Sequence, residues 1–203
     1  MSTTMDDVLR NMAMEEQYLE ELYDKHIDEF TDDMLKSYFL SHPQITLSAV
    51  KAFETAKSLL SNKYFTPALI YAAIVQEFTV KNILLTAIVH GLINNEIASD
   101  LITKFAIGHG SPSKFKEMII QLLDTHGGIN LSTYKRSGVT KTLWEEMTQI
   151  ILGRNEAVHK AKILTEAEAK LSIDVANEIL YVIFPSVIAK LGLRLQNNEI
   201  VPL

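Results

Sequence analysis

The chain has no cysteine among its 203 residues. This absence excludes disulfide bonds, a zinc site with thiolate ligands and a cysteine nucleophile. The chain also lacks the start of an export signal, because the acids Asp6 and Asp7 stand where a basic region would precede an apolar run. We therefore expect a cytoplasmic protein.

Long apolar runs are scarce as well. The most apolar stretches, such as residues 83–89, are interrupted by polar side chains before they reach the ~18 positions that a membrane-spanning helix requires. We therefore expect no membrane association. Hydrophobic residues still make up 47% of the chain, which is typical of globular proteins. A chain of this length buries about 70% of its unfolded surface, so it can form a core without covalent cross-links.

The negative charge is concentrated at one end of the chain. The net charge is −6, and residues 1–40 hold 11 acids and 3 bases, so this segment carries −8 and the rest of the chain carries +2. Bases outnumber acids between residues 134 and 162, where Arg136 is one of them. That balance favours a contact with phosphate groups, but an ordinary solvated surface has it too. The acidic segment is either a solvated helix face or a cover for a basic groove.

Apolar residues recur at helical spacing along nearly the whole chain, while strand-like alternation and Asn-Gly or Asp-Gly turns are missing. The sequence therefore predicts an all-α fold. We expect residues 1–42 to form an acidic N-terminal helical arm, with one helix or a helix pair, and residues 43–203 to form a helical bundle.

Capping and breaking residues predict where the helices begin. Pro67 is placed for the first turn of a helix through Leu92, which is apolar around most of its circumference and therefore central. Ser111 and Pro112 are expected to begin a further helix. Another helix is expected to resume at Val139 after a polar loop.

The last long helix has a distinct start and end in the sequence. Thr165 and Glu168 have the spacing of a capping box, so we expect the helix to begin there. Pro185 is expected to kink or stop it, because proline has no backbone N–H and its ring clashes with the preceding turn. A final segment is expected to run to about Leu195.

The segment from Arg154 to His159, RNEAVH, carries the clearest chemical pattern. Asn155 and His159 are four residues apart and share a helical face, whereas Arg154 and His159 lie about 140° apart around a helix. A single helix therefore holds the arginine and the histidine imperfectly, and two copies related by a two-fold axis would bring both pairs to one groove. Arg154 also continues the apolar row of Trp144, Met147 and Ile151, which we expect to face the core and where a charge needs a partner or a ligand.

This segment resembles the R-x4-6-H motif of the HEPN superfamily, which often has asparagine after the arginine. The similarity in organisation covers roughly residues 57–191, including an earlier helix that contains Glu77, a candidate accessory residue. The resemblance implies a multi-helix up-down bundle of HEPN type with an acidic arm. It also implies a homodimer that cleaves RNA without a metal ion or cofactor and leaves 2′,3′-cyclic phosphate ends.

The resemblance gives each residue of the motif an expected role. Arg154 would bind the phosphate, and His159 would act as general base on the 2′-hydroxyl or as acid toward the leaving oxygen. Asn155 would orient His159 or the backbone around it, and Lys160 and Lys162 would contact the RNA strand. The family's usual setting is bacterial stress or phage defence, with an antitoxin or another defence protein as a partner.

Other interpretations stay open at this point. HEPN toxins with nucleotidyltransferase antitoxins carry a tyrosine two residues after the histidine, where this chain has Ala161, so that subtype is not expected. The motif could belong to a catalytically silent module that binds RNA, nucleotide or a protein, or to a purely structural dimerisation bundle. In a structural role, Arg154 would pair with Glu156 or Glu77, and His159 would cap a helix end.

Overall fold

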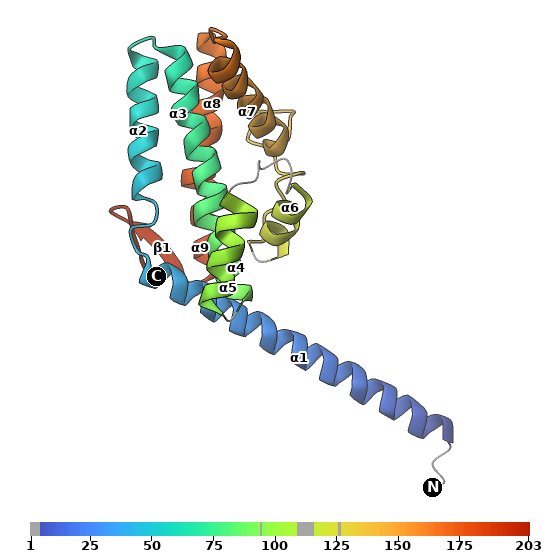
Figure 1. Cartoon of the computed structure of the whole chain (residues 1–203). Coiled ribbons are helices and arrows are strands. Elements are labelled where there is room, and N and C mark those ends of the chain that lie inside the picture. Colours follow the sequence, from blue (N-terminus) through green and yellow to red (C-terminus); the bar gives the residue numbers. More distant parts are fainter. Residues whose placement is uncertain (1–4, 94, 109–115, 126) are drawn as a thin grey trace.

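The computed structural model describes residues 5–93, 95–108, 116–125 and 127–203, and it is mostly helical (Figure 1). The predicted helical character is thereby confirmed. The helix start predicted at Ser111 and Pro112 lies outside the described residues. In chain order the elements are α1 (Met5–Ser41), α2 (Leu47–Ser61), α3 (Phe65–Phe78), the π-helical segment η1 (Thr79–Leu85), α4 (Thr86–Leu92), α5 (Glu96–Ile102), η2 (Thr103–Gly108), α6 (Lys116–Thr125), α7 (Leu143–Lys160), α8 (Glu166–Glu178), η4 (Ile179–Ile183), α9 (Phe184–Lys190), β1 (Leu193–Gln196) and β2 (Glu199–Pro202).

Two long helical rods form the centre of the bundle. One runs through α3, η1 and α4 from Phe65 to Leu92, as the sequence predicted, and the other runs through α8, η4 and α9 from Glu166 to Lys190. Each rod is long and apolar enough to cross a membrane, yet 72% of the apolar window of the first and 56% of that of the second are buried inside the structure. Burial in the core therefore accounts for their apolar composition.

The second rod stays helical past Pro185, where a kink or stop was expected. Its π-helical segment η4 directly precedes the proline, which occupies the first turn of α9. A π-helical turn shifts the hydrogen-bond pattern by one residue, so the missing N–H of proline and its ring are accommodated without ending the rod. The helix consequently reaches Lys190.

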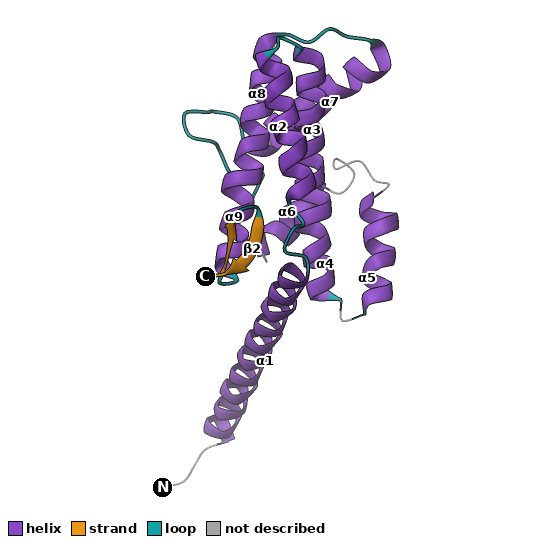
Figure 2. Ribbon diagram, turned by 90° about the vertical axis from the view of Figure 1, so that its left-hand side faces the viewer, coloured by secondary structure: helices purple, strands orange, loops and turns teal. Residues whose placement is uncertain are grey.

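A β-hairpin ends the chain, beginning within the final segment that was expected to run to about Leu195, although the sequence predicted no strands (Figure 2). Strand β1 pairs with β2, and the turn uses Asn197 and Asn198, both with positive φ. Asparagine tolerates this left-handed conformation and favours such tight turns. Ile200 is buried and its N–H donates to the carbonyl of Pro43, so the hairpin fastens onto the connection between α1 and α2.

Among the side chains of α1 that the structure describes, those of its C-terminal part pack on the bundle. Thr31, Leu35 and Phe39 recur every four residues and are buried, and the helix contacts α4. The preceding part projects away from the bundle as one straight helix in both views (Figures 1 and 2). The first 42 residues therefore contain both a projecting arm and a segment that belongs to the core.

We predict that Gly91→Ala weakens the packing of α1 on α4. A Cβ atom at Gly91 would lie 2.7 Å from the Cγ of Leu35 and 3.3 Å from the carbonyl oxygen of Thr31. Overpacking of this kind typically lowers the free energy of unfolding by about 1 to 3 kcal/mol. Gly153→Ala in α7 is the matched control, because its Cβ would lie 3.9 Å from Leu69, an ordinary contact, and should raise stability by up to about 1 kcal/mol. Equal thermal shifts for the two variants would contradict this prediction.

Candidate functional site

Helix α7 carries the RNEAVH motif and begins later than predicted. It starts at Leu143 rather than Val139 because Thr142 and Glu145 form a capping box, in which the Thr142 hydroxyl accepts from the N–H of Glu145. The Glu145 carboxylate in turn accepts from the N–H of Thr142. Leu143, Trp144, Met147 and Ile150 are buried, which fixes the rotation of the helix against the core.

Arg154 is half-buried, as its place in the register of the buried face predicted. Its Nη1 donates a hydrogen bond of 2.9 Å to the Oδ1 of Asn155. Asn155 was expected to orient His159, whereas here it holds the guanidinium. Glu156 and Glu77, the acids considered as partners for Arg154, pair with lysines instead. In the described part of the chain, Arg154 has no ion pair with a carboxylate.

His159 is exposed in the last turn of α7. It lies about 140° around the helix from Arg154, so within one chain the two side chains leave the helix in different directions. The motif therefore presents a half-buried guanidinium and an exposed imidazole that one chain does not bring together.

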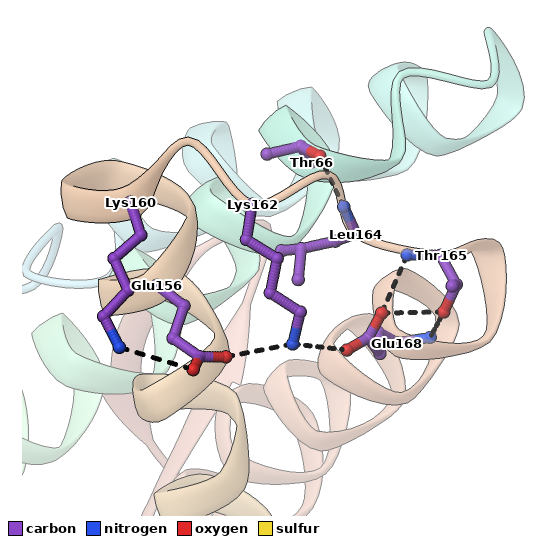
Figure 3. A network of polar contacts seen from close by, with 7 residues as sticks. All are labelled: Thr66, Glu156, Lys160, Lys162, Leu164, Thr165 and Glu168. Carbon is purple, nitrogen blue, oxygen red and sulfur yellow. Dashed lines mark hydrogen bonds and ion pairs between the residues drawn. The ribbon is translucent and has the colours of Figure 1, made fainter.

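Lys160 and Lys162, the predicted RNA contacts, take part in an ion-pair network with two acids (Figure 3). Glu156 lies 3.8 Å from the Nζ of Lys160 and 2.9 Å from that of Lys162, and Lys162 also lies 3.5 Å from Glu168. The bond to Lys162 lowers the pKa of Glu156, and the bond to Glu156 raises the pKa of Lys162. These pairs are exposed, so another anion could replace either acid with little loss.

The same network borders a hollow of about 510 Å³ along α7 that the sequence did not suggest. Its charged lining consists of Lys141, Lys162, Glu145, Glu156 and Glu168. Acids outnumber bases, so this surface offers no net positive charge to a phosphate. The excess of bases between residues 134 and 162 therefore does not make the lining of this hollow positively charged.

Helix α7 ends at a strained residue. Ala161 adopts the left-handed conformation with φ of 53°, and its N–H donates to the carbonyl oxygen of Glu156. Glycine occupies this position at many helix ends because it has no Cβ to clash. We therefore predict that Ala161→Gly raises the free energy of unfolding by about 0.5 to 1 kcal/mol in thermal denaturation. Ala157→Gly, inside the helix, should lower it by a similar amount, and a loss of stability in both variants would contradict the prediction.

Arg136 is not available to a phosphate, although the sequence placed it among the bases of this region. Its Nε and Nη2 donate to the two carboxylate oxygens of Glu146 at 2.9 and 2.7 Å. The side chain of Glu146 is 2% exposed and that of Arg136 is 14% exposed. This bidentate pair ties the loop before α7 to the helix. The local sequence does not reveal that Arg136 pairs with Glu146, because the two residues are ten positions apart in the chain.

The same loop is attached to α8 by Tyr134, whose hydroxyl donates to the Oε1 of Glu178 at 2.6 Å. Burial and the hydrogen bond to Glu178 raise the pKa of Tyr134 to about 12. Between pH 10 and 12 the unfolded chain would lose this proton while the folded chain keeps it, so folding binds more protons there.

We therefore predict that the contribution of Tyr134 to stability is present below pH 10 and is lost as the pH rises toward 12. Spectrophotometric titration of the tyrosines should show a component near 12 that Tyr134→Phe removes. Tyr64→Phe, at an exposed tyrosine, is the control and should leave that component in place. A titration curve unchanged by Tyr134→Phe would contradict the assignment.

Glu77, the candidate accessory residue, pairs with Lys81 at 3.1 Å. Lys81 is nearly fully buried in η1, so this pair neutralises a charge inside the core. Among the described residues, no group of three or more His, Asp and Glu side chains is placed to hold a metal ion. No protein-family model, curated protein or solved structure matches this chain.

Proposed function

We propose that the protein is a metal-independent endoribonuclease of HEPN type that acts as a homodimer with a composite active site. The observation that carries this proposal is the state of Arg154. Its half-buried guanidinium contacts the neutral side chain of Asn155 and, among the residues that the structure describes, no carboxylate. A partly desolvated cation without an anion is stabilised by an anionic ligand, and the guanidinium fork suits a phosphate.

The chemistry follows from the two side chains of the motif. His159 takes the proton of a ribose 2′-hydroxyl, and the 2′-oxygen then attacks the adjacent phosphorus. The bond from phosphorus to the 5′-oxygen breaks, and that oxygen receives a proton from solvent or from the protonated imidazole of His159. The products are a 2′,3′-cyclic phosphate and a 5′-hydroxyl. Arg154 binds the non-bridging oxygens, whose negative charge grows in the transition state.

A second copy of the chain would bring an Arg154 and a His159 together, which one chain does not do. Exposed apolar side chains flank His159, with Val158 52% exposed and Ile163 87% exposed. Such side chains beside a polar motif favour burial against another subunit. A two-fold axis at this end of the bundle would place Arg154 of one subunit near His159 of the other, in one groove.

The biological setting proposed with this activity is bacterial stress or phage defence in the cytoplasm. RNA is the substrate, and an antitoxin or another defence-system protein is the proposed partner. These proposals rest on the resemblance of residues 154–159 to the HEPN motif. Ala161 argues for a subtype other than the toxins that carry a tyrosine at that position.

A catalytically silent module that binds RNA, nucleotide or a protein is the second candidate. The pairing of Lys160 and Lys162 with Glu156 and Glu168 favours it, because paired lysines attract phosphates less strongly than free ones. Such a module would retain a ligand at Arg154 without cleaving it. Product formation therefore separates the two candidates.

The deciding experiment incubates the purified full chain with mixed RNA in excess EDTA and analyses the product ends. Cleavage that leaves cyclic phosphate, and that is lost in Arg154→Ala and His159→Ala, is the expected result. Arg194→Ala and His26→Ala are matched controls, because both residues are exposed and lie outside the motif. RNA that binds but stays intact would support the silent module, and cleavage that survives both motif variants would reject the site.

A further inference from the structure

The projecting part of α1 carries a row of apolar and aromatic side chains that the ribonuclease activity does not use. The row recurs every four residues and consists of Met14, Tyr18, Leu22, His26 and Phe30. Met14, Tyr18 and Phe30 are 63%, 62% and 51% exposed. Side chains four residues apart form a continuous ridge on a helix, and ridges of this kind are what a second helix packs against.

The ridge continues to the edge of the bundle. The next two positions at the same spacing are Met34 and Tyr38, which line a hollow of about 240 Å³ between α1 and α4. His90 of α4 lines the same hollow and stacks on Tyr38. A second hollow, of about 380 Å³, lies on the ridge itself and is lined by Tyr18, Glu21, Leu22 and His26. The ridge of the exposed arm therefore continues onto the part of α1 that borders α4.

The described part of this chain does not cover the ridge. The arm points away from the bundle in both views (Figures 1 and 2). Residues 5–30 extend roughly 39 Å at the usual rise of a helix. These side chains are therefore open to a segment of another molecule.

The charges along the arm select the chemistry of that molecule. Glu15, Glu21 and Asp33 are exposed beside the ridge, and residues 1–40 carry a net charge of −8. This charge repels RNA, an anionic membrane and the arm of a second copy. It attracts a basic segment, and an apolar ridge accepts a helix with a matching apolar face.

We propose that the projecting part of α1 is a docking helix for a basic amphipathic helix of a partner protein. The partner's apolar face packs on the ridge from Met14 to Phe30, and its lysines or arginines pair with the flanking acids. The end of the partner helix nearest the bundle reaches the hollow at Tyr38. This surface is separate from the RNEAVH motif, so the proposal stands whether or not the protein cleaves RNA.

The test measures binding of a synthetic basic amphipathic peptide of about 18 residues, made of Lys and Leu at helical spacing, to the full chain by fluorescence anisotropy. Tyr18→Ser and Leu22→Ser are expected to weaken binding by about tenfold or more. Glu16→Gln is the control, because Glu16 is exposed and, two residues from both Met14 and Tyr18, lies about 160° around the helix from them. It is expected to change the affinity by less than about twofold.

Two further measurements keep the proposal open to refutation. A peptide of the same composition with a scrambled order, which has no apolar face, is expected to bind at least about tenfold more weakly. Equal binding of the two peptides, or equal effects of Leu22→Ser and Glu16→Gln, would show charge attraction alone and would overturn the proposal. A change of the protein's mass from dimer to monomer in Leu22→Ser, measured by light scattering, would show that a second copy occupies the ridge and would overturn it as well.

Discussion

Replacing His159 with alanine is expected to slow RNA cleavage by about 100- to 10,000-fold, which is the usual contribution of a general acid or base. The side chain is exposed, and removing an exposed side chain usually changes stability by less than about 0.5 kcal/mol. The melting temperature should therefore stay within about 2 °C of that of the unmodified protein. Initial rates on a fluorescent RNA and a thermal melt of the same preparation measure both effects.

An active site shared between two subunits also predicts that two inactive variants can restore activity to each other. Arg154→Ala and His159→Ala chains, each inactive alone, are expected to recover activity when they are unfolded, mixed and refolded together. In the mixed dimer, one chain supplies Arg154 and the other supplies His159, so one groove contains both. Activity that does not return on mixing, while mixed dimers form, would contradict a site shared between subunits. A large fall in melting temperature without a loss of activity would assign His159 to the fold instead.

Replacing Arg136 with alanine is expected to lower the free energy of unfolding by about 3 to 5 kcal/mol, the usual effect of removing one partner of a buried ion pair. The variant leaves the carboxylate of Glu146, which is 2% exposed, without the two hydrogen bonds that it accepts in the native protein. Chemical denaturation followed by circular dichroism measures the change. Lys135→Ala is the control, because the neighbouring lysine is exposed and should have little effect.

A double variant separates the pair itself from the penalty of an unpaired charge. Arg136→Met together with Glu146→Leu removes both charges and keeps apolar volume, so it is expected to be considerably more stable than Arg136→Ala. A double variant as unstable as the single one would show that the shape of the pair, rather than its charge, holds the loop to α7. In both outcomes the pair links α7, which carries the motif, to Arg136, a residue ten positions before Glu146 in the chain.

Local signals predicted most of the helical structure. The capping box at Thr165 and Glu168 and the central helix after Pro67 were expected and are present. The start of α7 was missed although Thr142 and Glu145 have the same spacing as the capping box that was recognised. The C-terminal hairpin was missed because two asparagines in its turn replace the Asn-Gly pair that usually signals it.

The candidate site shows a different limit. The half-burial of Arg154 followed from its position in the helical period, since Trp144 and Met147 share that face. Its contact with Asn155 did not follow, because neighbouring side chains on a helix can adopt several rotamers. The pairing of Lys162 with Glu156 and Glu168 depends on how the chain turns between α7 and α8, and the left-handed Ala161 sets that turn.

Helix positions, the acidic arm and the residues of the RNEAVH motif follow from the order of amino acids alone, because they depend on contacts within about four residues. The partners of buried charges depend on residues far apart in the chain. Only the packed structure decides that Arg136 serves Glu146 and that Arg154 remains without an acid in the described part of the chain. The physical reason is that desolvation makes an unpaired charge costly only after the surrounding helices have excluded water.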